Sequence, residues 1–168
     1  MKTVHYGIWF ILLSSLQPTL LNYIKIYGIK PNLILIFIVL IAFFEGKKDG
    51  AAVGAVFGLF FDLLVGKIVG LHAILYMYLG SLFGIASEKF LKKPTLIIAV
   101  PVVLLVSLLT GCAEYVFRIL NIAQFSFKYA FLGILLPEAV YSAIFTIPMY
   151  LILKKTLKIF SVNKRVNE

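Results

Sequence analysis

Apolar runs, separated by short segments rich in charged residues, proline and glycine, divide the chain into six candidate membrane-spanning helices. Each run has the composition of a segment that faces hydrocarbon. The predicted spans cover residues 4–22, 31–44, 50–65, 71–87, 94–117 and 137–153. This pattern predicts an all-α bundle in which residues 1–168 form a single integral membrane domain.

Prolines and one segment of mixed polarity refine the predicted positions of the helices. Pro31, Pro94 and Pro137 stand where a helix can begin, because the first helical position needs no backbone N–H. Pro101 and Pro148 lie inside spans and should each remove one backbone hydrogen bond. Residues 121–136 are apolar but include Gln124, Ser126 and Lys128, which favours an interfacial or re-entrant segment over a seventh span.

The third span carries small residues at a constant spacing of four. Its row is Gly50, Gly54, Gly58, Asp62, Gly66 and Gly70. Such a row forms one groove on a helix and allows a neighbouring backbone to approach closely in a membrane. We therefore expect the others to pack around this helix, with Gly80 and Gly84 of the fourth span as a second small pair. The groove would also suit the helix of a partner protein.

Composition agrees with a membrane location and gives no sign of catalysis. Hydrophobic residues make up 62% of the chain and charged residues 14%, with a mean hydropathy of +1.04, which is too apolar for a soluble domain of this size. The net charge of +9 lies mostly at helix ends, where it suits lipid head groups rather than nucleic acid. The single cysteine, Cys112, allows no internal disulfide. With two distant histidines and no phosphate-binding loop, we expect no metal, no cofactor and no enzymatic activity.

The distribution of basic residues predicts the orientation. Six spans place both termini on one side, and 11 of the 16 lysines and arginines fall on that side. The heavier side is predicted to be cytoplasmic. The five basic residues on the outer side are Lys25, Lys30, Lys67, Arg118 and Lys128.

With that orientation, ionisable residues from several spans come to one level near the outer surface. The predicted cluster contains Asp62, Glu114, Arg118 and Glu138, and His72 joins it. A one-turn ion pair would equally account for Glu114 and Arg118, and the helix dipole for Glu138. Asp62 is either an interior polar contact or a side chain that reaches toward the head groups.

Short motifs give the chain a resemblance to the MreD family of bacterial rod shape-determining proteins. They lie at residues 16–20 (LQPTL), 28–33 (GIKPNL), 54–71 and 136–138 (LPE), with Tyr141 and Pro148 beyond them. The residues that carry the match are Gln17, Pro31, Asn32, Asp62, Gly66, Gly70 and Pro137. Asn32 stands where the family often has Asp, and His72 where Asn is expected.

The resemblance implies a non-catalytic scaffold in the bacterial inner membrane. Such a subunit of the wall-elongation complex would bind MreC and, through it, link MreB filaments to RodA and its penicillin-binding partner. The alternative is a substrate-binding subunit of an energy-coupling factor transporter, and we expect the fold of the family to resemble that of these subunits. Those subunits carry an alanine pair in the first helix, and the corresponding stretch here, residues 5–10 (HYGIWF), has none.

Overall fold

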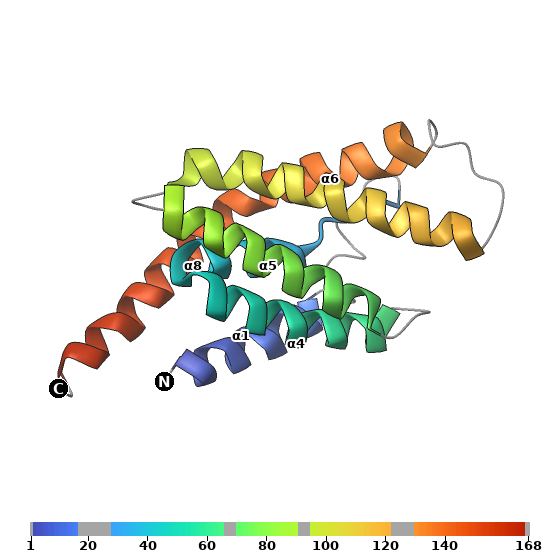
Figure 1. Ribbon diagram of the computed structural model, residues 1–168. Coiled ribbons are helices and arrows are strands. Elements are labelled where there is room, and N and C mark those ends of the chain that lie inside the picture. Colours follow the sequence, from blue (N-terminus) through green and yellow to red (C-terminus); the bar gives the residue numbers. More distant parts are fainter. Residues whose placement is uncertain (1, 17–27, 66–69, 91–94, 122–129, 167–168) are drawn as a thin grey trace.

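The structure is a computed structural model that describes residues 2–16, 28–65, 70–90, 95–121 and 130–166. All the regular elements in these ranges are helices (Figure 1). They are α1 (Lys2–Leu16), α3 (Leu33–Glu45), α4 (Lys47–Val65), α5 (Leu71–Phe90), α6 (Leu96–Asn121), η1 (Phe131–Leu135) and α8 (Leu136–Val166). The expected features at Gln17, Gly66 and Pro94, and residues 122–129 of the mixed segment, lie outside the described ranges.

Helix α3 is the centre of the bundle. Every residue from Leu33 to Phe43 is buried, and α4, α5, α6 and α8 all pack against it. On the remaining side Trp9 of α1 lies on Phe37, with 5.5 Å between the ring centroids. A helix that is apolar all round is typical of a buried position. Its 13 residues rise only about 20 Å, which is shorter than the hydrocarbon core of a bilayer.

The expectation that the third span, now α4, would be the central helix is therefore wrong. Val56, Leu59 and Leu63 of α4 are exposed, so one face of this helix lies on the outside of the bundle. Its glycine face is enclosed, and so is the face that carries Val53 and Phe57, where Phe57 lies on Phe37 of α3. In a membrane an apolar face can contact lipid or protein at a similar free energy. The sequence pattern therefore does not show which of α3 and α4 is the central helix.

The glycine row of α4 meets protein backbone, as predicted, and the backbone belongs to α5. A side chain at Gly54 would collide with the carbonyl of Tyr76, and one at Gly58 with the carbonyl of His72. At Gly50 it would lie 2.8 Å from the carbonyl oxygen of Gly80. Gly80 and Gly84 return the contact onto the backbone of α4. Since α5 fills the groove, the groove is not free for the helix of a partner, and that expectation is also wrong.

Several helix boundaries differ from those predicted from the sequence. Helix α3 begins at Leu33 with Asn32 as its cap, so Pro31 precedes the helix. Helix α4 already begins at Lys47, one residue after Gly46, whose positive φ of 89° suits glycine. The last helix begins before Pro137: the N–H of Leu136 bonds to the carbonyl of Phe131, a π-type turn that leads directly into α8. Helix α8 then continues through residues 154–166, beyond the predicted span.

The bundle has a basic end and a polar end. Figure 1 shows the first turn of α1 and the last turns of α8 at the same end. Exposed lysines lie there at the beginning of α4, the end of α5 and in α8, namely Lys47, Lys48, Lys89, Lys154 and Lys155. Of the described helices, two are long and apolar enough to cross a membrane, α6 over Leu96–Val116 and the combined η1 and α8 over Phe131–Leu157. The end opposite the lysines carries the candidate site.

Candidate functional site

Asp62, near the end of α4, caps the beginning of α5. The connection places Gly70 at the position that would normally supply a capping side chain, and glycine has none. The Asp62 carboxylate takes that role from eight residues away. It accepts hydrogen bonds from the backbone N–H groups of Gly70 (2.9 Å), His72 (3.1 Å) and Ala73 (3.1 Å). The desolvation cost of this buried carboxylate is thus offset by N–H donors that the start of a helix otherwise leaves unpaired.

The imidazole of His72 connects Asp62 to Glu114. Nδ1 lies 2.6 Å from Oδ1 of Asp62, and Nε2 lies 3.1 Å from Oε1 of Glu114. The three side chains come from α4, α5 and α6, so one imidazole links three helices. The Asp62 side chain is inaccessible to solvent, whereas 28% of the Glu114 side chain is exposed. Glu114 is therefore the most accessible member of this chain of groups.

A second network lies beside the first and involves Asn32, Tyr76 and Ser142. The side-chain oxygen of Asn32 caps α3 by accepting from the N–H of Leu35 (3.0 Å), and its amide nitrogen donates to the hydroxyl of Tyr76 (2.8 Å). The backbone N–H of Asn32 donates to the hydroxyl of Ser142 in α8 (3.1 Å). All three residues are buried. This network ties the beginning of α3 to α5 and α8.

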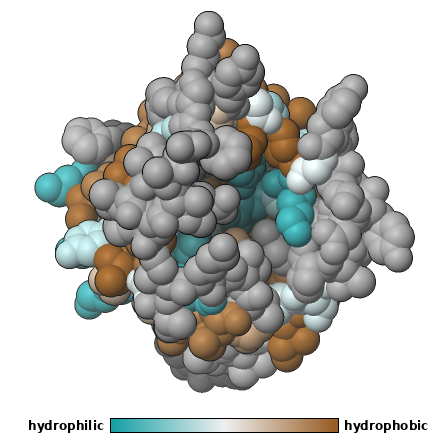
Figure 2. Space-filling view, turned by 90° about the vertical axis from the view of Figure 1, so that its right-hand side faces the viewer, coloured by the Kyte–Doolittle hydropathy of each residue, from teal (hydrophilic) through white to brown (hydrophobic). Residues whose placement is uncertain are grey.

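The two networks form one layer at this end of the bundle. The rings of His72 and Tyr76 are 5.6 Å apart, and Phe61 contacts His72 with 4.8 Å between centroids. We call the set Asn32, Asp62, His72, Tyr76, Glu114 and Ser142 the polar layer; it draws on α3, α4, α5, α6 and α8. Figure 2 views this end face-on and shows hydrophilic side chains gathered in a hollow at its centre.

The structure brings part of the predicted outer cluster together. Asp62 and Glu114 meet through His72. Glu138 lies in the first turn of α8, half-buried and one turn before Ser142. The side chain of Arg118 lies outside the described part of the structure, so its pairing with Glu114 stays a prediction. The functional role of all four residues is likewise untested by the geometry.

Sequence reasoning placed no weight on Tyr76 and Ser142. The signal available was spacing: Tyr76 is four residues after His72 and Ser142 four residues after Glu138, so each shares a helix face with a residue already selected. Asn32 was selected as part of the family pattern, but its capping role was not foreseen.

The geometry of the polar layer does not resemble a metal site. Within the described residues, no three histidine, cysteine or acidic side chains are arranged to hold an ion. The reason is visible at His72, because both ring nitrogens already face carboxylate oxygens. The carboxylates lie on opposite sides of the ring and do not converge on one point.

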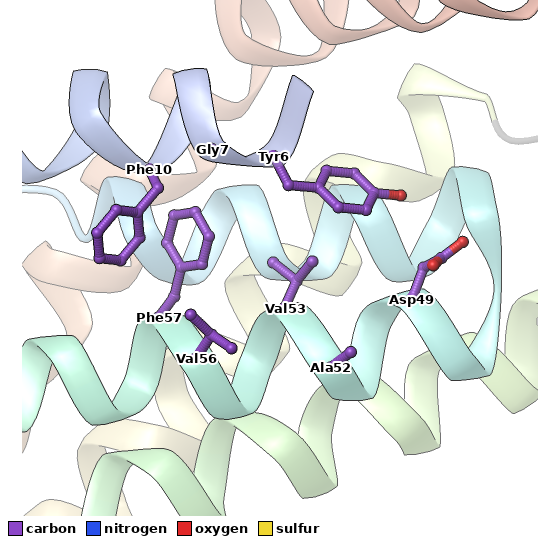
Figure 3. A pocket seen from close by; sticks show the side chains of 8 residues that line it. All are labelled: Tyr6, Gly7, Phe10, Asp49, Ala52, Val53, Val56 and Phe57. Carbon is purple, nitrogen blue, oxygen red and sulfur yellow. The ribbon is translucent and has the colours of Figure 1, made fainter. Parts of the chain in front are cut away.

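A separate groove lies between α1 and α4, on the basic side of the bundle. It has a volume of about 460 Å³ and is mostly apolar; Figure 3 shows its lining of Tyr6, Gly7, Phe10, Asp49, Ala52, Val53, Val56 and Phe57. A side chain added at Gly7 would meet nothing within 4 Å. The only polar side chains of the lining, Tyr6 and Asp49, lie at one end of the groove (Figure 3).

Comparison with known proteins identifies the family. The family model described as rod shape-determining protein MreD matches residues 2–160, which is nearly the whole chain. No curated protein and no solved structure matches it. The match covers every helix of the polar layer. With this coverage, the chain belongs to the MreD family of rod shape-determining membrane proteins.

Proposed function

We propose that this protein is a non-catalytic, multi-pass scaffold of the bacterial plasma membrane that binds MreC within the wall-elongation complex. Family membership implies a part in determining rod shape and association with the shape-determining complex. The proposal adds the direct partner MreC, with RodA, its penicillin-binding partner and MreB reached through it. We further propose that the protein itself catalyses no reaction.

The observation that carries the scaffold role is how the buried polar groups are used. The carboxylate of Asp62 is hydrogen-bonded to three backbone N–H groups and an imidazole. The side chain of Asn32 caps the start of a helix and bonds to a tyrosine hydroxyl. These groups hold helices in fixed relation to one another. A rigid bundle of this kind supports a binding surface whose geometry depends on helix positions.

For orientation, we propose six spans with both termini in the cytoplasm. The support is the exposed lysines Lys47, Lys48, Lys89, Lys154 and Lys155, which share one end with the first turn of α1. Short basic segments favour the cytoplasmic side. The polar layer then faces the outside of the cell. Helix α3, which is shorter than the bilayer is thick, crosses only because longer neighbours enclose it completely.

For the contact with MreC, we propose the end of the bundle that carries the polar layer. The glycine row is occupied by α5, which removes the other candidate surface. At the polar end, Glu114 and Glu138 are half-buried on neighbouring helices, so the surface there carries polar groups from α6 and α8. A polar extracytoplasmic segment of the partner would suit it.

The test is affinity purification of the tagged full-length protein, cross-linked in growing cells of the species that encodes it. Recovery of MreC with the wall-synthesis enzymes would support the scaffold. Recovery of a pair of ATPases without MreC would instead indicate the transporter alternative.

A charge reversal locates the contact. Glu138→Lys should reduce the MreC recovered, whereas Glu88→Lys, the same change in an exposed residue at the basic end, should not. Equal recovery from both variants would show that MreC binds elsewhere on the bundle.

A further inference from the structure

The two ring nitrogens of His72 both face carboxylate oxygens, and this fixes how many protons the group must hold. A neutral imidazole carries one N–H and one acceptor nitrogen. Hydrogen bonds at 2.6 Å to Asp62 and 3.1 Å to Glu114 cannot both form from a neutral imidazole and two ionised carboxylates. One additional proton is needed.

The surroundings of Asp62 decide where that proton lies. Its Oδ2 accepts from the N–H groups of Gly70 and Ala73, and its Oδ1 accepts from the N–H of His72. A carboxyl group surrounded by donors is held in the ionised form. Nδ1 of His72 therefore carries a proton and donates it to Asp62. The additional proton belongs to the pair of Nε2 and Oε1 of Glu114.

We propose that His72 and Glu114 form a proton-binding site that fastens α5 to α6. The single proton is either on the imidazole, facing an ionised Glu114, or on Glu114, facing a neutral imidazole; both forms make the same hydrogen bond. When the proton leaves, a nitrogen lone pair faces an ionised oxygen, and the contact becomes repulsive. Exchange with water proceeds through Glu114, which is the exposed member of the network.

The helices on the two sides of this bond belong to different parts of the bundle. Helix α4 packs along α5, while α6 packs mainly on α8 and only slightly on α3. The bond between His72 and Glu114 is a direct polar link from one pair to the other. The neighbouring link through Asn32, Tyr76 and Ser142 uses an amide and two hydroxyls, which keep their protons near neutral pH. Loss of the shared proton therefore frees α6 from α5 at this end of the bundle, while α6 stays packed on α8 and the link through Asn32, Tyr76 and Ser142 stays closed.

Other charges near the site belong to the elements packed around it. Among the described residues they are Asp62 of α4, Glu114 of α6 and Glu138 in the first turn of α8, with Tyr76 on α5 itself. Lys30, two residues before Asn32, is a basic residue at the same end.

Nuclear magnetic resonance of the protein with ¹⁵N-labelled histidine, reconstituted in liposomes, detects the proton. The protein contains two histidines, and His72→Asn identifies the signals of the second. From about pH 5 to about pH 9, a range that brackets ordinary imidazole titration, we expect one transition in the His72 ring signals. In Glu114→Gln this transition should be absent from the range. Constant signals across the range, or the same transition in Glu114→Gln, would overturn the proposal.

The native thiol of Cys112, two residues before Glu114 on α6 and half-buried, detects the release of the helix. The rate of maleimide labelling is measured for the unmodified protein and for Glu114→Gln at each pH. The ratio of the two rates removes the pH dependence of the thiol itself, and this ratio should change at least threefold across the transition. Glu88→Gln, with its carboxylate at the other end of the bundle, should follow the unmodified protein. A constant ratio would show that the proton does not hold α6.

Discussion

Gly54 of α4 lies directly against the backbone carbonyl of Tyr76 of α5, with no space for even a methyl group between them. The two helices approach closely at Gly50, Gly54 and Gly58. Backbone dispersion contacts and the Asp62 cap therefore act on the same pair of helices. Helices joined in this way behave as one unit. The predictions below test the contacts that build it and the polar layer at its end.

Gly54→Leu should strongly destabilise the protein, because a side chain at this position can be placed only by separating α4 from α5. Overpacking of a tight contact costs about 1–3 kcal/mol, and often more when backbone is the obstacle. The measurement is the thermal unfolding midpoint in detergent. Gly7→Leu is the control, since a Cβ there meets nothing within 4 Å and Gly7 lines an open groove. A Gly54→Leu midpoint equal to that of the unmodified protein would contradict the close contact.

Tyr76→Phe should destabilise the protein by about 1–3 kcal/mol, because the buried amide of Asn32 loses its acceptor. Tyr78→Phe is a matched control on the same helix, since Tyr76 is fully buried and Tyr78 is 66% exposed. Denaturation of the purified protein measures both. Equal stability of the two variants would mean that the Asn32 bond contributes nothing.

Asp62→Leu should leave the protein inserted in the membrane but lower its stability and weaken assembly with MreC. The change leaves three N–H groups at the start of α5 and the His72 ring without their acceptor. Loss of a capping side chain alone costs about 0.5–2 kcal/mol. Asp62→Asn keeps one acceptor oxygen and should be intermediate.

Two measurements check this prediction: the unfolding midpoint in detergent, and cell width together with recovery of MreC. Normal cell width and normal recovery of MreC in the Asp62→Leu strain would show that Asp62 is not needed for assembly. An unchanged unfolding midpoint would show that its cap of α5 does not stabilise the protein.

Accessibility of single cysteines should reveal the orientation. In a Cys112→Ala background, Lys30→Cys at the polar end should react with a membrane-impermeant maleimide in intact cells, and Lys48→Cys at the basic end only after lysis. Both lysines are exposed, so burial does not explain a difference. The opposite labelling pattern would invert the proposed topology.

The polar end of the bundle could be predicted in part because its residues break an otherwise apolar pattern. Asp62 and Glu114 stand out in their spans for that reason, and the glycine spacing identified the face of α4 that meets backbone. The centre could not be predicted. Residues 33–43 are apolar on every side, and lipid would accept such a helix as readily as protein does.

Helix ends were predicted less well where long-range contacts decide them. Nothing local shows that Gly70 receives its cap from Asp62, or that α8 begins through a π-type turn ahead of Pro137. The role of His72 also depends on the fold, because its two acidic partners lie 10 and 42 residues away. Only the folded bundle brings them to the same ring.

Trp9 is the only tryptophan in the chain, and it lies between α1 and the central helix with its ring on Phe37. The tryptophan fluorescence of the protein therefore originates at a single contact, between α1 and α3. Any lipid, ligand or partner that lifts α1 away from α3 would alter the emission without a label or an engineered probe.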